Sequence, residues 1–365
     1  MPGLTPIVVF RADGSTAQGA GHVMRGLALA AALNEGGARC VFVLGDARGA
    51  GAIAATVTGR GHEVVLIPVT AWEDDATRTR AIATERGARL VITDICTTAR
   101  RRDPTALVAY HGTLMTSSAP PFVVTFDDAT GAAYASDVVV IPYFRAGPVP
   151  GESRPGQVRL AGAEYFVFRR EFVDAAHTAA SRTIAAQGRN VLVTIGGSDA
   201  YGVTVRVARA VATIEPGVVT ARFVLGPGTA PAIVREVQAI VAGWPGDAEV
   251  LVEPPSLAAL MLWADLAVTG EGLTKYETAV TATPSLMISQ FDTDGVLVRE
   301  FEQAGTTRHL GNAATLDETA IAKALLDVLG DAVARRTMAE RGRALVDGRG
   351  VERILARLPK DVWTT

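Results

Sequence analysis

A histidine in the glycine-rich stretch 11–26 stands where it could act as a general base. The stretch reads R-A-D-G-S-T-A-Q-G-A-G-H-V-M-R-G and lies between the apolar run Ile7–Phe10 and the alanine- and leucine-rich run Leu27–Leu33. This order predicts a strand, a loop and a helix that begins at about His22. The helix dipole disfavours protonation of an imidazole on the first turn, and a general base near pH 7 must be neutral.

The neighbours of His22 suggest a ligand site around it. Gly19 and Gly21 have no Cβ, so a ligand could approach the backbone closely. Arg25 lies one turn along the same face of the predicted helix. Met24 occupies the place of the third glycine of a dinucleotide-binding fingerprint, and no acid stands at the expected distance. We therefore predict no cofactor. The alternative is that His22 is a structural residue.

Carboxylates follow several predicted strands, at the edge of a parallel sheet where ligands bind. Asp13 follows the first strand, Asp94 ends the strand that begins at Leu90, and Asp127-Asp128 ends another. Each could face a ligand or merely cap a turn. The predicted catalytic residue is His22, and the predicted substrate-binding residues are Asp13, Gly19, Gly21, Arg25 and Asp94.

Two loops in the second half could hold a nucleotide. Gly196–Asp199 (G-G-S-D) lies between a predicted strand and helix, and offers N–H groups and a hydroxyl to an anion. Thr269–Glu277 reads T-G-E-G-L-T-K-Y-E, in which the first helical amides could hold a diphosphate and Glu277 the ribose hydroxyls. The predicted nucleotide-binding residues are Gly197, Ser198, Asp199, Gly272, Leu273, Thr274 and Glu277.

Ordinary structural interpretations of these loops stay open. Ser198 or Asp199 could simply cap a helix, and Glu277 could be a surface acid with Lys275 as its solvated partner. Asp292-Thr293-Asp294 resembles the metal-binding D-x-D of some glycosyltransferases, but we interpret it as a polar loop in which Asp294 begins a helix. The remaining histidines lack metal-ligand spacing, so no metal site is predicted: His62, His111, His177 and His309.

The composition indicates a well-packed globular protein with two domains. The chain has 365 residues, of which 48% are hydrophobic and 20% charged, and its net charge of -3 argues against nucleic-acid binding. We expect no signal peptide, and no apolar run reaches the roughly 18 residues that a membrane span requires. Cys40 and Cys96 suggest neither a disulfide nor a metal site. A cytoplasmic location is therefore expected, and the oligomeric state is open.

Apolar runs of strand length alternate with helical patterns, which predicts βαβ units and parallel sheets. The breaker-rich segment 144–157 is the expected junction, so the predicted domains are 1–155 and 156–365. We predict two Rossmann-like, doubly wound domains facing a cleft. The predicted strands are 7–10, 40–44, 63–67, 90–93, 122–126 and 138–141 in the first domain, and 190–195, 222–225, 249–252, 266–269 and 285–288 in the second.

Together these motifs resemble the nucleotide-sugar hydrolase family of pseudaminic acid biosynthesis and its spore-coat polysaccharide relatives. The similarity runs through nearly the whole chain. It includes R-x-D, G-x-G-H-x-x-R, F-D-D, L-A-G-A-E-Y-F-V-F-R-R-E-F at Leu160–Phe172, T-I-G-G-S-D, V-L-G-P at Val224–Pro227 and D-G-R-G at Asp347–Gly350. The resemblance implies a GT-B fold and implies that His22 activates water.

The second half also resembles the glycosyltransferase that adds N-acetylglucosamine to the peptidoglycan lipid precursor. Its G-A-L-T-x-x-E segment, which holds the nucleotide, matches Gly272, Leu273, Thr274 and Glu277 here. Two places that face the sugar in the hydrolases differ: Cys96 replaces a tyrosine, and Ser289-Gln290-Phe291-Asp292 replaces a segment with Asn-Gln.

The resemblance implies metal-independent hydrolysis of a nucleotide sugar, a UDP-linked deoxy amino sugar, with inversion. The alternatives are a glycosyltransferase with the same site and a non-catalytic sugar-nucleotide binding protein.

Overall fold

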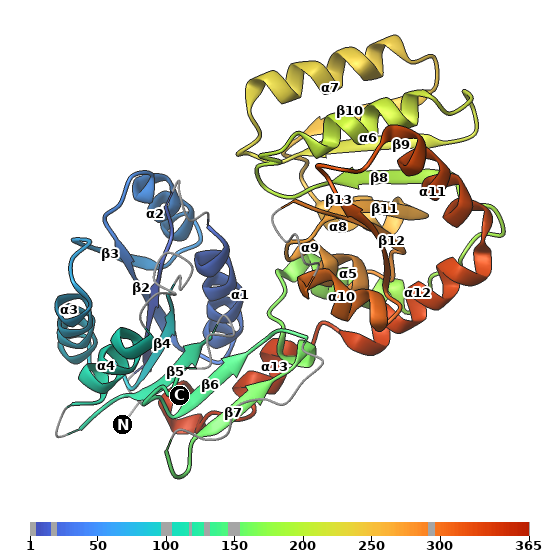
Figure 1. Cartoon of the computed structure of the whole chain (residues 1–365). Coiled ribbons are helices and arrows are strands. Elements are labelled where there is room, and N and C mark those ends of the chain that lie inside the picture. The colour runs from blue at the N-terminus through green and yellow to red at the C-terminus, as the bar shows by residue number, and fades with distance from the viewer. Residues whose placement is uncertain are drawn as a thin grey trace. The chain divides into compact units, whose positions relative to one another are not determined.

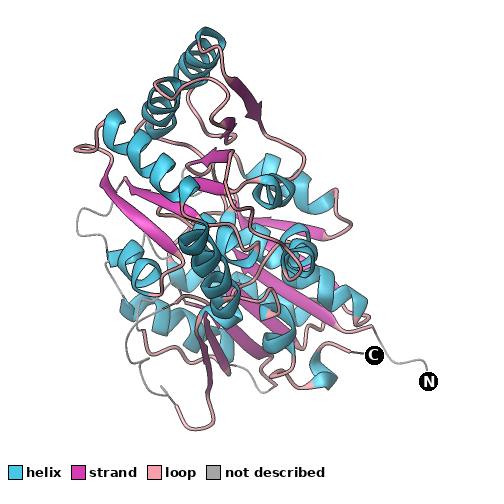
Figure 2. Cartoon of the chain, turned by 90° about the vertical axis from the view of Figure 1, so that its right-hand side faces the viewer, coloured by secondary structure: helices cyan, strands magenta, loops and turns pink. Residues whose placement is uncertain are grey.

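The structure is a computed structural model that describes residues 5–15, 20–95, 104–116, 119–127, 132–144, 154–290 and 296–364. The chain forms two compact units (Figure 1). The first comprises residues 1–169 and 349–365, and the second comprises residues 170–348. In each unit helices pack along a parallel sheet, and Figure 2 distinguishes the helices from the strands by colour.

The first unit contains a seven-stranded sheet in the order β3-β2-β1-β4-β5-β6-β7. The strands are β1 (Ile7–Ala12), β2 (Arg39–Gly45), β3 (Glu63–Ile67), β4 (Leu90–Asp94), β5 (Phe122–Phe126), β6 (Val138–Ile141) and β7 (Val158–Ala161). The helices are α1 (Gly21–Glu35), α2 (Ala50–Thr58), α3 (Trp72–Glu85), α4 (Pro104–Met115) and α13 (Gly350–Leu355), with the 3-10 helices η1 (Ala163–Tyr165) and η2 (Lys360–Val362).

The second unit contains a six-stranded sheet in the order β10-β9-β8-β11-β12-β13. The strands are β8 (Asn190–Thr194), β9 (Thr220–Leu225), β10 (Asp247–Val252), β11 (Leu266–Gly270), β12 (Ser285–Ser289) and β13 (Thr307–Asn312). The helices are α5 (Arg170–Ala179), α6 (Val203–Ala212), α7 (Pro231–Gly243), α8 (Leu257–Trp263), α9 (Thr274–Val280), α10 (Val296–Gln303), α11 (Glu318–Gly330) and α12 (Ala332–Leu345).

The strand order identifies where a ligand would bind in each unit. In both sheets the order reverses beside the first strand, between β1 and β4 and between β8 and β11. In doubly wound sheets, ligands bind at the carboxyl ends of the strands at this switch point. The switch points therefore place the ends of β1, β4, β8 and β11 at the candidate sites.

The sequence of β1 explains how the first sheet carries helices on both faces. Val8 and Phe10 belong to a core that includes Leu27 and Leu33 of α1. Val9, on the opposite face, belongs to a second core with residues of α3 and α4. Successive strand side chains point to opposite faces, so a continuous apolar run is buried on both.

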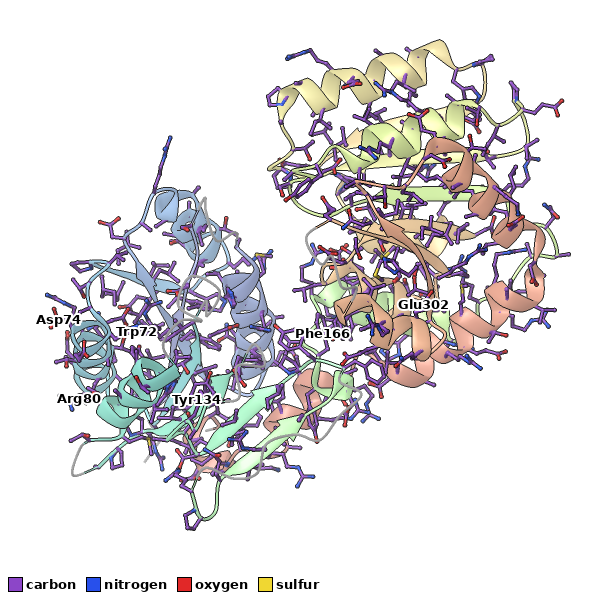
Figure 3. The ribbon with its side chains drawn as sticks, in the orientation of Figure 1. Trp72, Asp74, Arg80, Tyr134, Phe166 and Glu302 are labelled. Carbon is purple, nitrogen blue, oxygen red and sulfur yellow. The ribbon has the colours of Figure 1, made fainter. Side chains whose placement is uncertain are left out.

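Aromatic side chains pack α3 against α4 on the second face of the sheet. The Trp72 ring, labelled in Figure 3, meets Tyr110 edge-on with ring centroids 5.6 Å apart. His111 lies in turn edge-on to Tyr134, at 5.0 Å. Edge-to-face pairs at this spacing add to the stability gained by burial.

Several sequence predictions are confirmed in detail. All predicted strands form, and α1 begins at Gly21, one residue before the expected start. Gly37 and Gly87, which follow α1 and α3, have left-handed φ values of 91° and 64°. Ser256 caps α8, since its side chain accepts a hydrogen bond from the backbone N–H of Ala259 at 3.2 Å.

The division between the units differs from the expected junction at 144–157. β7 follows that segment but pairs with β6 of the first sheet, with Val158 opposite Val138. The end of the chain also returns to the first unit, where Ile354 and Leu358 join the core that contains Leu33. The second unit thus ends at residue 348 rather than 365, because the apolar face of α13 is buried against α1.

Across the described ranges, no helix is long and apolar enough to cross a membrane.

Candidate functional site

A close contact between helix and sheet positions the first turn of α1 in the first unit. Gly26 lies against the sheet, and a Cβ there would stand 3.1 Å from the Phe42 ring and 3.4 Å from the Phe10 ring. Gly26 thus lets α1 pack tightly across β1 and β2. The register of β1 and β4 places Ala12 beside Asp94, so the helix start and the strand ends meet at the switch point.

His22, Arg25 and Asp94 form one hydrogen-bonded cluster at this place. Nδ1 of His22 lies 2.7 Å from Oδ1 of Asp94. Arg25 donates from Nε to Oδ2 at 2.6 Å and from Nη2 to Oδ1 at 2.6 Å. The carboxylate of Asp94 therefore forms a bidentate ion pair with Arg25 and accepts a hydrogen bond from His22. Such bidentate geometry is strong and directional.

The charge state of Asp94 fixes the proton on His22. Burial alone would raise the pKa of Asp94, but the charge of Arg25 and the contacts with His22 outweigh burial and lower it to about 2. An ionised carboxylate can only accept hydrogen bonds, so Nδ1 of His22 carries the proton. The neutral imidazole then has Nε2 as the nitrogen that can take a proton, as in other bases oriented by a carboxylate.

Two aromatic residues that sequence reasoning did not single out also contact Arg25. Nη1 donates to the hydroxyl of Tyr143 at 3.0 Å, and the guanidinium lies over the Phe126 ring, 4.9 Å from its centroid. Both residues stand at the carboxyl ends of predicted strands, β5 and β6. A position at or just after the end of a strand is the sequence signal that identifies such residues.

Asp13 lies beside this cluster but within a buried ion-pair network. Its Oδ1 accepts from Nη1 of Arg11 at 2.8 Å, and Arg11 also donates to both oxygens of Asp75 on α3. Asp13 is 4% exposed and Arg11 1%. Burial would lower the pKa of Arg11, but Asp13 and Asp75 raise it above its ordinary value. The backbone N–H of Asp13 donates to the carbonyl of Asp94 at 3.2 Å, which ties the two strand ends together.

Of the two predicted loop glycines, Gly21 is described and Gly19 lies outside the described residues. A Cβ at Gly21 would meet no heavy atom of the described part within 4 Å, so no neighbour there requires a glycine. The sequence interpretation, a glycine that leaves room for a ligand, stays a prediction.

In the second unit, Asp199 caps α6. Its carboxylate accepts from the backbone N–H groups of Val203 at 2.8 Å and Thr204 at 2.9 Å, and burial raises its pKa above the ordinary value. The first amides of α6 are therefore occupied by the side chain of the protein itself. Gly197 and Ser198 are exposed on the same loop. Asp199 is buried, and its hydrogen bonds to α6 hold the loop in place.

The loop after β11 brings the other predicted nucleotide residues to the second switch point. Gly272 and Leu273 are exposed, and Glu277 is half-buried on α9. Lys275 is only 7% exposed and donates to the carbonyl of Glu271 at 3.1 Å, so it is a buried residue and not the solvated partner of the alternative interpretation. Glu271 accepts in turn from the backbone N–H of Gln290 at 3.1 Å. The loops that follow β11 and β12 are thus joined.

The spacing of the histidines in the sequence predicts no metal site. Asp292 and Asp294 lie outside the described residues. Among the residues that the structure does describe, no group of three or more His, Cys, Asp or Glu side chains could hold a metal ion.

Comparison with known proteins identifies one sequence relative. The spore coat polysaccharide biosynthesis protein SpsG of Bacillus subtilis (strain 168) is 24% identical over 204 residues, which make up 56% of this chain and 59% of SpsG. The match thus spans less than two thirds of SpsG. No protein-family profile matches the chain.

Solved structures match nearly the whole chain. MurG of Acinetobacter baumannii has a TM-score of 0.68 at 14% identity, covering 97% of this chain and 99% of MurG. The glycotransferase of kitacinnamycin has a TM-score of 0.61 at 17% identity, covering 98% and 100%. MnaA of S. aureus, solved with UDP, has a TM-score of 0.60 at 13% identity, covering 96% and 95%. The fold is GT-B. The predicted fold class, with two Rossmann-like domains, is confirmed.

Proposed function

We propose that this chain is an enzyme that hydrolyses a nucleotide sugar to free sugar and nucleoside diphosphate. The observation that carries the proposal is the His22–Asp94 pair at the switch point of the first sheet, with Nδ1 and Oδ1 2.7 Å apart. A carboxylate that fixes the tautomer of a histidine is the arrangement of a general base. The sequence relationship to SpsG supports a role in polysaccharide biosynthesis.

In the proposed reaction, Nε2 of His22 takes a proton from a water molecule as the water oxygen attacks the anomeric carbon. The bond between that carbon and the diphosphate oxygen breaks, and the electron pair leaves with the nucleoside diphosphate. Attack from the face opposite the leaving group inverts the anomeric configuration. Asp94 stays ionised throughout and stabilises the imidazolium that forms on His22.

We assign nucleotide binding to the second unit. Gly272, Leu273 and Thr274 would offer backbone N–H groups to the diphosphate, and Glu277 would accept both ribose hydroxyls. Gly197 and Ser198 would contact the phosphates, with Asp199 holding their loop. The proposal that the nucleotide is UDP is supported by MnaA and by Anabaena HepE, which were both solved with UDP. The sugar proposed is a deoxy amino sugar.

A glycosyltransferase is the second candidate, because MurG and the glycotransferase of kitacinnamycin share the fold over nearly the whole chain. In that reaction the same base would take a proton from an acceptor hydroxyl. The two candidates differ in whether nucleoside diphosphate is released when water alone is present.

The test is to incubate the protein with a panel of UDP-linked sugars without acceptor and to measure UDP release. We expect release with at least one deoxy amino sugar. His22→Asn should lower turnover by about 10²–10⁴-fold, the usual range for a lost general base, with nucleotide affinity retained. His177→Asn, an exposed histidine on α5, is the matched control and should retain turnover.

Release that requires an added acceptor would select the transferase. Binding of UDP-sugars with no turnover in either assay would show a binding protein. Turnover in His22→Asn near the wild-type rate would contradict the assignment of the base, and Asp13 would be the next candidate.

A further inference from the structure

Arg25 contacts the His22–Asp94 pair, although a general base oriented by a carboxylate does not require a neighbouring arginine. A carboxylate against an imidazole stabilises the protonated ring, since opposite charges attract. A histidine held permanently as imidazolium could not take a proton from water. In this structure Arg25 contacts both oxygens of that carboxylate, at 2.6 Å each. Its Nη2 also lies 3.3 Å from Nδ1 of His22.

We propose that Arg25 is the counter-charge that keeps His22 neutral beside Asp94, and that Tyr143 fixes Arg25 in that place. This inference deepens the proposed function, because it concerns His22 as its base. Arg25 is then a positioning residue that acts through Asp94 and His22. The sequence had indicated a substrate-binding role for it instead.

The contacts of Arg25 fix its charge inside the protein. Nε and Nη2 donate to Asp94, Nη1 donates to the Tyr143 hydroxyl at 3.0 Å, and the guanidinium plane lies over Phe126. The side chain is 9% exposed, so water screens it little and charges act on one another strongly. An arginine does not lose its proton in a protein, so this positive charge is present at every working pH.

Among the described contacts of the cluster, the charge of Arg25 offsets that of Asp94, and this leaves no net charge when His22 is neutral. Asp94 contributes one negative charge and Arg25 one positive charge. The neighbouring Asp13 is paired with Arg11 at 2.8 Å, and Tyr143 is an uncharged phenol that faces Arg25. A proton on Nε2 would place a second positive charge beside Arg25. The ground state is therefore a neutral imidazole, and Asp94 still stabilises the proton that arrives during the reaction.

The test is a titration of the His22 ring by NMR in the protein without ligand, with the signal assigned by its loss in His22→Asn. Arg25→Gln removes the positive charge, and the titration midpoint of His22 should rise by about one pH unit or more. Asp94→Asn removes the negative charge, and the midpoint should fall. The double variant should return close to wild type. Arg39→Gln, which removes an exposed arginine paired with Glu63, is the control and should leave the midpoint in place.

Opposite shifts from the two single variants are not expected from a merely structural role, which would lower the yield of folded protein or the rate at every pH. If Arg25→Gln does not fold, the comparison between Asp94→Asn and the double variant carries the same information: adding Arg25→Gln should raise the midpoint. An unchanged midpoint in folded Arg25→Gln overturns the inference. A raised KM for a nucleotide sugar with an unchanged midpoint would return Arg25 to substrate binding.

The pH profile of UDP release gives the second measurement. In Arg25→Gln the acid limb should move to higher pH by about one unit or more, so turnover at pH values below both midpoints should fall about tenfold or more and recover in alkaline buffer. Arg25→Lys keeps the charge, so its limb should stay in place while its plateau falls. Because the NMR titration requires no turnover, a shifted midpoint in a protein that cleaves no nucleotide sugar would uphold the counter-charge and reject the proposed function.

Discussion

At the scale of single residues, the first unit separates two acids that look equivalent in the sequence. Asp13 directly follows β1 and Asp94 ends β4, and these two strands are neighbours at the switch point. Asp13 forms an ion pair with Arg11, whereas Asp94 contacts His22 and Arg25. The difference lies in which basic side chain reaches each carboxylate.

Glu277 is the residue on which nucleotide affinity should depend most directly. We expect Glu277→Ala to weaken UDP binding about tenfold or more, because hydrogen bonds to charged groups contribute about 1.5–3 kcal/mol. Isothermal titration with UDP measures this, and Glu318→Ala, which removes another half-buried acid, on α11, serves as control. An equal dissociation constant in wild type and Glu277→Ala would leave Glu277 as a surface acid.

His111 should make the protein less stable in mild acid. Its Nδ1 donates to the Leu107 carbonyl at 2.7 Å, and Nε2 accepts from Thr93 at 2.9 Å. Burial lowers its pKa to about 4. The unfolded chain binds this proton near pH 6.5, so stability is complete above that pH and is lost progressively as the pH falls toward 4.

Between pH 7.5 and pH 5 the loss from this group is about 2 kcal/mol. Urea unfolding at both values measures it. The variant His111→Gln cannot gain this proton, so its stability should change less over the same interval. Equal pH dependence in the two proteins would assign the loss to other groups.

At the scale of elements, the cap of α6 links the stability of a helix to the shape of the loop that contains Gly197 and Ser198. Asp199 satisfies two helical N–H groups and has a positive φ of 42°. Asp199→Ala should cost about 2 kcal/mol of unfolding free energy, since it removes the cap and since alanine tolerates the left-handed conformation less well than aspartate.

The comparison variant is Asp331→Ala, which removes the cap of α12 at Ala334. Both variants should lower the melting temperature. Asp199→Ala should also weaken UDP binding, because Gly197 and Ser198 lie on the loop that it holds. If both caps affected UDP affinity equally, the effect would come from general destabilisation of the second unit.

The elements that the sequence predicted are those with a strong local signal. Buried strands such as β1 and β4 are continuous apolar runs, so their positions follow from the pattern alone. β7 (V-R-L-A) and β13 (T-R-H-L-G-N), which the sequence did not predict, are edge strands with charged residues. The pairing of Arg25 with Asp94 joins residues 69 apart. It depends on the order of the strands, and no local pattern encodes that order.

At the scale of the whole molecule, the last 17 residues belong to the core of the first unit. Ile354, Leu355, Leu358 and Val362 are each less than a tenth exposed, and they share a core with α1. Burial of such side chains contributes about 1.5–3 kcal/mol each, so together they approach the total stability of a domain.

Removing residues 349–365 should therefore unfold the first unit and leave the second folded. Circular dichroism and proteolysis of the truncated chain would show this, with residues 170–348 alone as the reference for an intact second unit. Residues 1–169 joined by a glycine–serine linker to 349–365 should fold. Cooperative unfolding of residues 1–169 alone, at an unchanged melting temperature, would contradict the prediction.

The return of the chain at Arg349 makes residues 170–348 an insertion in the first unit. The two edges of the insertion are neighbours, since a Cβ at Gly350 would collide with the carbonyl oxygen of Phe166. A segment that enters and leaves a host fold at adjacent points can be exchanged as a block, because the host loses no element. In the proposed function, the base and the nucleotide site thus lie on separately replaceable modules. Under that proposal, transplanting the insertion changes the sugar-nucleotide specificity and leaves the chemistry of His22 in place.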